Sequence, residues 1–240
     1  MLKPENIAII GGGAIGTAFS KELIIKYPDS KINIFSRKPV NSHINSISHH
    51  LIDYDDISSI HSAAELASSE GPLDLVLVAT GILHDEHLRP EKSLRDLSSQ
   101  NFETVFKVNT IVPALIAKYF LPILSRNTGS VFAALSARVG SISDNQLGGW
   151  YAYRASKSAL NMIIKSASIE VARKNPKAIV VGLHPGTVDS NLSKPFQHNV
   201  DANKLFTPEF AAQKMLLVLD GLTSSQTGKC FAWDGSEILP

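Results

Sequence analysis

Short apolar runs alternate along this chain with longer segments whose apolar residues are spaced as on one face of a helix. The runs Asn6–Ile10 and Leu73–Ala79 are apolar at most positions, which is typical of strands buried on both faces. We predict strands at Asn6–Ile10, Lys31–Phe35, His50–Ile52, Leu73–Ala79, Ser130–Leu135, Ala178–Leu183 and Lys229–Ala232. We predict helices at Ala14–Lys26, Ile57–Ser69, Glu103–Leu124, Tyr151–Arg173 and Pro208–Leu222.

Buried strands separated by helices predict a parallel sheet, because a parallel connection needs a crossover that covers one face. Right-handed crossovers then give an α/β, doubly wound parallel sheet (a Rossmann fold), and 240 residues fit a single domain. Ligands of such sheets bind beyond the carboxyl ends of the strands. The loops to search for chemistry are therefore 11–16, 36–38, 80–90, 136–150 and 184–205.

Composition excludes several classes of protein. Hydrophobic residues make up 44% of the chain, charged residues 19%, and the net charge is +1, so no nucleic-acid surface is indicated. No run reaches the roughly 18 apolar residues of a membrane span, and no signal peptide is predicted. The single cysteine, Cys230, excludes an internal disulfide and fits a cytoplasmic protein.

A glycine turn follows the first predicted strand and opens the first helix. It reads G-x-G-x-x-G, in which Gly11 permits the tight turn, Gly13 lets the backbone approach a pyrophosphate, and Gly16 allows close packing of the helix. The free N–H groups near Ala14 and Ile15 would meet the phosphate charge. A turn that binds nothing is the alternative, and the position after the first strand favours a dinucleotide site.

The end of the second predicted strand indicates which dinucleotide binds. NAD sites usually carry an acidic residue there, whereas NADP sites use arginine near the 2′-phosphate. Here the chain reads Ser36-Arg37-Lys38. Arg37 can pair with a phosphate through two parallel hydrogen bonds, and Ser36 can donate another. We therefore predict NADP(H) in preference to NAD(H), against the alternative of a solvated basic loop.

Tyr153 precedes Lys157 by four residues, which places both side chains on one face of a predicted helix. A nearby ammonium favours phenolate and lowers the pKa of tyrosine, so Tyr153 could exchange a proton while a cofactor exchanges hydride. Tyr27 and Lys31 share the spacing, but Pro28 disfavours a helix between them, and they precede a strand on the opposite side of the sheet. We interpret that second match as a chance one.

The order of these motifs resembles the short-chain dehydrogenase/reductase family over almost the whole chain. The stretch 149–161 (GWYAYRASKSALN) and the ending 231–235 (FAWDG) resemble its C-factor-like subgroup, which includes some carbonyl reductases. The motifs, in the order in which the family carries them, are the glycine turn, Asp53, Ala79-Thr80-Gly81, Asn109, a serine after the fifth strand, Tyr153 with Lys157, and Pro185-Gly186.

The resemblance implies a role for each matching residue. Asp53 matches the acid that bonds the adenine amino group, and Thr80-Gly81 match the segment that faces the cofactor. Asn109 matches the helix asparagine that holds a water near the lysine and so completes a proton relay. Pro185-Gly186-Thr187 match the turn beside the nicotinamide, where Thr187 would hold the carboxamide.

Two departures from the family pattern bear on these assignments. The glycine turn is one residue shorter than the family's usual T-G-x-x-x-G-x-G, which could alter the geometry around the phosphates. The catalytic serine falls at Ser136 when counted from Gly129, but the position becomes Ala137 when counted back from Gly140. Ser141 and Ser143 lie nearby. We favour Ser136, whose hydroxyl would hold the substrate oxygen.

Two other segments suggest less specific roles. His84, Asp85, Glu86 and His87 match no metal-binding spacing, so we predict no metal site and expect this loop to border the substrate space. Residues 188–206 form a long polar stretch after a strand, and we predict a lid over cofactor and substrate.

The sequence thus predicts an NADP(H)-dependent oxidoreductase that interconverts a small-molecule carbonyl and an alcohol, with Asn109, Ser136, Tyr153 and Lys157 as catalytic residues. A dinucleotide-binding signalling or regulatory protein without turnover is the alternative, and the uncertain serine favours it. An epimerase or dehydratase would need a further substrate domain. The apolar helices Glu103–Leu124 and Tyr151–Arg173 are expected to form a homodimer or homotetramer.

Overall fold

The computed structural model describes residues 3–39 and 46–240, and its core is an eight-stranded sheet in the order β3-β2-β1-β4-β5-β6-β9-β10. Its strands are β1 (Asn6–Ile10), β2 (Lys31–Ser36), β3 (Ile47–Leu51), β4 (Leu75–Val78), β5 (Ser130–Leu135), β6 (Ala178–His184), β9 (Cys230–Ala232) and β10 (Glu237–Ile238). All neighbours are parallel except β10, which pairs antiparallel with β9. Two short strands, β7 (Thr187–Val188) and β8 (Leu205–Phe206), pair apart from this sheet.

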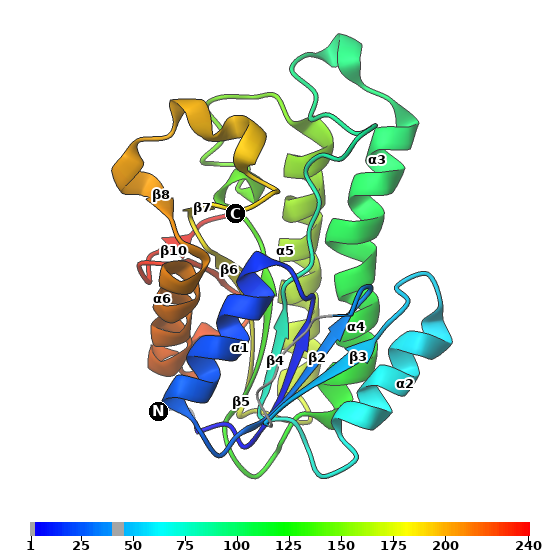
Figure 1. Cartoon of the computed structure of the whole chain (residues 1–240), viewed down its shortest axis with the longest axis vertical. Helices are drawn as coiled ribbons and strands as arrows, with labels where there is room; N and C mark the ends of the chain where they lie inside the picture. Colours follow the sequence, from blue (N-terminus) through cyan, green and yellow to red (C-terminus); the bar gives the residue numbers. More distant parts are fainter. Residues whose placement is uncertain (1–2, 40–45) are drawn as a thin grey trace.

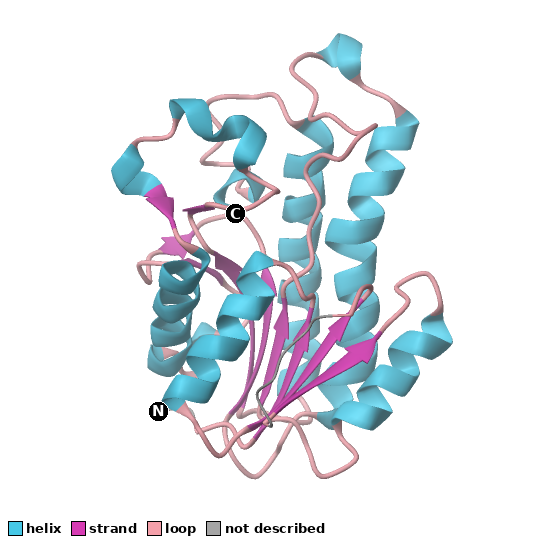
Figure 2. Cartoon of the chain, viewed as in Figure 1, coloured by secondary structure: helices cyan, strands magenta, loops and turns pink. Residues whose placement is uncertain are grey.

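Helices cover both faces of the sheet (Figure 1). They are α1 (Ala14–Lys26), α2 (Ile57–Ala67), α3 (Ser99–Phe106), α4 (Val112–Phe120), α5 (Tyr151–Ala172) and α6 (Pro208–Gly221). The face with α1 and α6 and the face with α2, α4 and α5 each enclose a separate apolar core. Figure 2 shows the strands running upward between these two layers, toward the loops at the top of the view.

The two cores follow from the alternation of side chains along each strand. In β1, Ile7 and Ile9 belong to the core beside α1 and α6, whereas Ala8 and Ile10 belong to the core beside α2, α4 and α5. All four side chains are fully buried. A strand buried on both faces must be apolar at successive positions, which is the pattern that predicted it, and the doubly wound parallel fold is confirmed.

The predicted helix Glu103–Leu124 is interrupted in the structure. A π-helical segment, Lys107–Ile111, separates α3 from α4, and a 3₁₀ turn, Leu121–Ile123, follows α4. Pro113 has no N–H to donate to the carbonyl four residues earlier, and the N–H of Val112 instead bonds the carbonyl of Lys107. The wider turn shifts the face on which Asn109 lies.

The predicted strand His50–Ile52 was placed too late in the chain, because β3 spans Ile47–Leu51. This strand lies at the edge of the sheet, where exposed polar residues weaken the apolar signal. The predicted limits of β1 and β5 are confirmed, and those of β2, β4, β6 and β9 differ from the structure by at most two residues at either end. The short strands β7, β8 and β10 were not predicted, because strands of two residues carry no periodicity.

The stretch Ser99–Ile123, which joins α3, the π-helical segment, α4 and the 3₁₀ turn, is long enough and apolar enough to cross a membrane. Its apolar residues have another explanation in this fold. Val112, Ile116 and Phe120 are buried in the core between α4 and the sheet. The hydropathy of this stretch therefore reflects its packing inside the molecule.

Candidate active site

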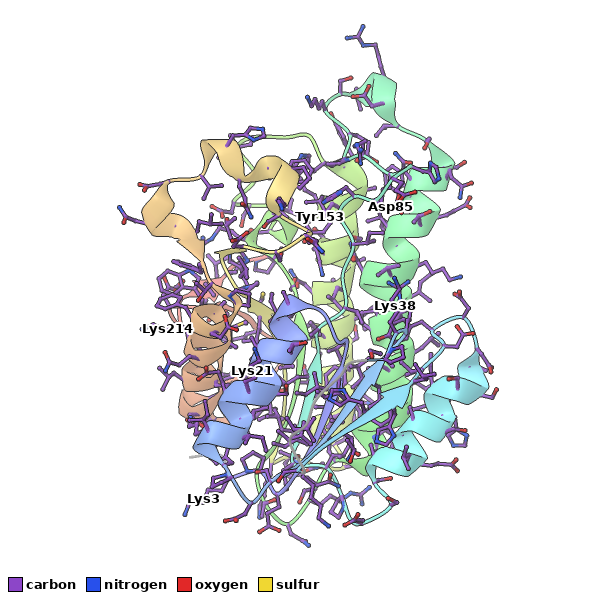
Figure 3. The ribbon with its side chains drawn as sticks, in the orientation of Figure 1. Lys3, Lys21, Lys38, Asp85, Tyr153 and Lys214 are labelled. Carbon is purple, nitrogen blue, oxygen red and sulfur yellow. The ribbon has the colours of Figure 1, made fainter. Side chains whose placement is uncertain are left out.

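A cavity of about 810 Å³ opens beyond the carboxyl ends of β1, β4 and β5. It includes the point between β1 and β4 where the strand order reverses, which is where doubly wound sheets bind ligands. Lys38, Asp85 and Tyr153, labelled in Figure 3, all line it. The other lining residues are Gly13, Ala14, Ile15, Arg37, Ala79, Thr80, Gly81, Ile82, Leu83, His84, Glu86, Val108, Leu135, Ser136, Lys157, Pro185, Ser190, Asn191 and Leu192.

The glycine turn has the close packing that its sequence predicted. Gly11 adopts φ +115°, and a Cβ atom there would stand 2.8 Å from the carbonyl oxygen of Ala79. A Cβ at Gly16 would stand 1.9 Å from the carbonyl oxygen of Gly11, so only glycine lets α1 begin this close to β1. A Cβ at Gly13 would meet nothing within 4 Å, and Gly13 lines the cavity. The shortened turn therefore leaves the start of α1 open to a ligand.

A smaller cavity of about 290 Å³ adjoins this turn and is lined by Gly11, Gly13, Arg37, Lys38 and Thr80 among others. Tyr54 also lines it, with its ring 5.9 Å from the guanidinium of Arg37, a contact that no sequence motif predicted. Ser36 lines it too, but its hydroxyl donates to the carbonyl of Lys38 at 2.6 Å.

Asp53 was predicted to bind adenine, but it lines neither cavity. Its carboxylate accepts the backbone N–H of Asp55 at 2.8 Å, and its own N–H donates to Ser59 at 2.9 Å. Asp53 thus shapes the turn before α2 and presents Tyr54 to the cavity. The structure does not bring the carboxylate of Asp53 to the predicted site.

Lys157 is buried at the bottom of the larger cavity. Its ammonium donates to the carbonyl of Leu135 at 2.7 Å, where β5 ends. A Cβ at Gly81 would stand 3.9 Å from Nζ, an ordinary contact distance, so Gly81 lies directly beside the ammonium. Burial lowers the pKa of Lys157 to about 8, because the charged form loses its hydration. The ammonium has one carbonyl acceptor and keeps donors for a ligand.

Tyr153 lies one helical turn before Lys157, with Nζ 5.8 Å from the centre of its ring. We expected the lysine to lower the pKa of the phenol. In this structure burial dominates and raises the pKa of Tyr153 to about 12, since a buried phenolate would lose its hydration. Tyr153 is therefore a protonated phenol at neutral pH, and this is the form that donates a proton.

Asn109 lies in the π-helical segment and is completely buried. Its amide forms two hydrogen bonds to the backbone of Ile82, accepting the N–H at 2.8 Å and donating to the carbonyl at 2.9 Å. Its Nδ2 also lies 3.2 Å from the hydroxyl of Ser156. A Cβ at Gly81 would stand 3.7 Å from its Oδ1. Asn109 thus joins the loop after β4 to α5, close to Lys157.

The structure distinguishes among the candidate serines. Ser136 follows β5 and lines the cavity, and its hydroxyl donates to Oδ1 of Asn161 at 2.6 Å. Ser141 and Ser143 bond each other at 3.3 Å and do not line the cavity. Asn161 was not predicted, although it lies four residues after Lys157 and so on the same face of α5.

The turn after β6 is only partly in the cavity. Pro185 lines it, whereas Gly186 and Thr187 do not. Gly186 adopts φ +77°, and a Cβ there would stand 2.6 Å from the ring of Phe206. Thr187 begins β7 and pairs with Leu205, and its contact with a carboxamide stays a prediction.

Residues 188–206, the segment predicted to be a lid, follow this turn and contribute to the wall of the cavity. Ser190, Asn191 and Leu192 line the cavity, and the carbonyl of Asn191 lies 2.9 Å from Nε2 of His84. Phe196 packs against His84 and against Trp150, with ring centres 5.6 and 5.1 Å apart. The loop with His84 therefore borders the same space as the lid.

This fold and site define a class of protein, and comparison with known families agrees. A sequence model of the family described as short chain dehydrogenase matches residues 5–201. The chain belongs to the short-chain dehydrogenase family.

The similar proteins include one named as a signal, one named as a dehydrogenase and one named as a carbonyl reductase. The chain is 34% identical over 147 residues to the C-signal of Myxococcus xanthus, covering 61% of this chain and 82% of that protein. It is 28% identical over 189 residues to 1-hydroxy-2-glutathionyl-2-methyl-3-butene dehydrogenase of Rhodococcus sp. (strain AD45), covering 77% and 76%. NADPH-bound carbonyl reductase from chicken fatty liver shares the fold, with a TM-score of 0.85, 23% identity and full coverage of both chains.

Proposed function

We propose that this protein reduces a small-molecule carbonyl compound to the alcohol with NADPH. The observation that carries the proposal is that one cavity contains basic side chains at one end and Ser136, Tyr153 and Lys157 at the other. The Rhodococcus relative is named a dehydrogenase and the chicken protein a carbonyl reductase, and both names support the same class of reaction.

The residues present fit a dinucleotide. Gly13 leaves open space at the start of α1, and the hydroxyl of Thr80, which lines both cavities, is buried without a hydrogen-bond partner among the described residues. Arg37 and Lys38 would hold a 2′-phosphate, the first turn of α1 the pyrophosphate, and Lys157 a ribose hydroxyl. When bound, NADPH supplies the hydride.

The chain's own residues then handle the carbonyl oxygen. Ser136, whose O–H bonds Oδ1 of Asn161 here, would turn this one donor to the substrate oxygen, and the phenol of Tyr153 donates the proton that converts that oxygen to a hydroxyl. Lys157 stabilises the phenolate that remains, since no carboxylate of the described residues bonds to its ammonium and compensates its charge. Asn109 positions the loop after β4 beside Lys157. Burial raises the pKa of Tyr153, so the phenol is protonated at neutral pH, which is the state that carbonyl reduction requires.

The signalling alternative is not favoured. The uncertain position of the serine was the feature that supported it, and Ser136 lies in the cavity with Tyr153 and Lys157. C-signal is among the relatives, but that resemblance covers only 61% of this chain.

We also propose that the protein assembles as a homo-oligomer through α4 and α5. A groove of about 510 Å³ lies between these helices, and Met162 and Ile169 on α5 are 66% and 51% exposed. Exposed apolar residues on adjacent helices are suited to a second copy of the chain. Sedimentation velocity would contradict this proposal by showing a monomer at micromolar concentration.

The test of the cofactor is a fluorescence titration of the protein with NADPH and, separately, with NADH. We expect Arg37→Ala to weaken NADPH binding about 10- to 100-fold, because one charge-assisted contact contributes about 1.5–3 kcal/mol, and to leave NADH binding unchanged. The control is Arg173→Ala, because Arg173 is exposed and lies at the C-terminal end of α5, opposite the end that carries Tyr153. Equal binding of the two nucleotides by the wild type would remove the preference, and binding of neither would overturn the reductase proposal.

A further inference from the structure

The helix that carries Tyr153 lacks a capping side chain of its own. Trp150 occupies the N-cap position of α5 with φ 52° and ψ 42°, the left-handed region, and makes no capping hydrogen bond. N-cap residues are normally extended, with a short polar side chain that accepts an N–H of the first turn. Gly148 and Gly149 before it also have positive φ. The side chain of Arg154 links the first turn to the loop by donating to the carbonyls of Gly148 and Gly149. Among the described residues, no side chain of that loop anchors the first N–H groups of the turn that contains Tyr153.

Glu91 supplies that anchor from the segment after β4. Its side chain is 2% exposed, and its Oε2 accepts the N–H of Ala152 at 3.2 Å. Its backbone carbonyl accepts the N–H of Trp150 at 2.5 Å. A Cβ at Gly149 would come within 3.4 Å of that carbonyl oxygen, so glycine permits the approach. A carboxylate at a helix N-terminus also interacts favourably with the helix dipole.

The same segment contacts the other parts of the site. Ile82 bonds Asn109 through both its N–H and its carbonyl, and His84 lies 2.9 Å from the carbonyl of Asn191 in the lid. We define residues 82–91 as the strap. In Figure 1 the strap rises from the end of β4 toward the top of the molecule, and its last residue touches the start of α5.

The burial of Glu91 is costly for the fold. Its Oε1 is buried and has no hydrogen-bond partner among the described residues. A buried carboxylate with an unpaired oxygen destabilises a protein, and apolar residues of similar volume often replace such groups without loss of stability. An apolar side chain would remove this cost, although it would leave the N–H of Ala152 without its acceptor, so the two effects on stability oppose each other.

We propose that Glu91 is a positioning residue for the reaction: by capping α5 from the strap, it holds the hydroxyl of Tyr153 in register with Ser136 and Lys157. This inference rests on the proposed carbonyl reduction, and it assigns no contact between Glu91 and the substrate. It predicts that loss of the acceptor affects the chemical step more than cofactor binding or stability, because misplacement of a reacting group by about 1 Å can lower a rate about 100-fold.

The experiment compares Glu91→Met and Glu91→Gln with the control Lys92→Ala. Lys92 is exposed and directly follows the strap. We expect Glu91→Met to keep a Tm close to that of the wild type and a similar Kd for NADPH, while kcat falls about 10- to 100-fold. Glu91→Gln keeps an oxygen acceptor for Ala152 and should retain kcat within about 3-fold. Lys92→Ala should not differ from the wild type.

Hydrogen–deuterium exchange gives a readout that does not depend on activity. Glu91→Met should exchange faster than the wild type in peptides that cover 151–157 and equally in peptides that cover 160–172. Faster exchange with an unchanged kcat would overturn the inference, as would an equal loss of kcat in Glu91→Gln. If Glu91→Met does not fold, Glu91→Gln decides: a kcat within about 3-fold and unchanged exchange in 151–157 support the capping role, and a loss of kcat overturns it. A wild-type protein that binds NADPH but reduces no carbonyl contradicts the proposed function, whereas unchanged exchange in a folded Glu91→Met contradicts the capping role.

Discussion

Tyr153 and Lys157 show how burial sets the chemistry of individual side chains. Burial opposes charge, so it raises the pKa of the tyrosine to about 12 and lowers that of the lysine to about 8. At neutral pH the phenol therefore keeps its proton and most of the lysine keeps its charge. This pair of protonation states suits proton donation to a carbonyl oxygen.

The hydroxyl of Tyr153 can be tested alone. We expect Tyr153→Phe to lower kcat about 10²- to 10⁴-fold, the usual contribution of a positioned acid, because the ring is kept and only the proton donor is lost. NADPH fluorescence should still report binding. Tyr151→Phe, in the same turn but outside the cavity, is the matched control. Activity of Tyr153→Phe equal to that of Tyr151→Phe would assign the acid to another group.

At the scale of elements, the start of α1 contains two glycines with different constraints. Gly16 is enclosed by backbone, with the carbonyl of Gly11 where a Cβ would stand. Gly13 has φ −78°, an ordinary value for any residue, and open space around the position of its Cβ. Gly16 therefore serves the packing of the helix on the sheet, and Gly13 serves the ligand side.

Alanine at each position separates these two roles. Gly16→Ala should destabilise the fold by about 1–3 kcal/mol, since the added methyl overlaps backbone and forces α1 away from β1. Gly13→Ala should leave the free energy of unfolding unchanged or slightly raised, while it weakens NADPH binding. Urea unfolding and nucleotide titration of both variants measure the difference. Equal stability of the two variants would contradict the assigned packing role of Gly16.

At the scale of the whole molecule, the fold keeps a histidine neutral in its interior. His184 ends β6, and burial lowers its pKa to about 4, with the charge of Arg138 acting in the same direction. Its Nδ1 has no hydrogen-bond partner among the described residues. Between pH 6.5 and 4 the unfolded chain binds a proton at this residue and the folded chain does not. The contribution of His184 to the free energy of unfolding is therefore fully present above pH 6.5 and is lost as the pH falls toward 4.

We expect this effect to reach about 3 kcal/mol at pH 4, because burial lowers the pKa of His184 from 6.5 to about 4. His184→Phe cannot bind the proton, so its unfolding free energy should fall less than that of the wild type between pH 7 and pH 4. Urea unfolding at several pH values measures the difference, with the exposed His61 replaced by alanine as the control. Parallel pH profiles for wild type and His184→Phe would show that His184 does not contribute.

The sequence by itself determined the layers of this protein and two parts of its site, the glycine turn and the pair Tyr153 and Lys157. Strands buried on both faces must be apolar at successive positions, and the glycine turn and the spacing of Tyr153 and Lys157 are local patterns that a helix or turn displays directly. For these features, neighbours in the chain are also neighbours in space.

Only the tertiary structure decided which further residues lie beside these two parts of the site. It selected Ser136 among the nearby serines by placing it in the cavity, and it directed Asp53 to its own turn rather than to the cavity. It also brought Asn109 to Ile82 and Glu91 to Ala152, pairs separated by 27 and 61 residues. Such contacts depend on how segments distant in sequence pack together, and no periodicity or spacing within one segment encodes them.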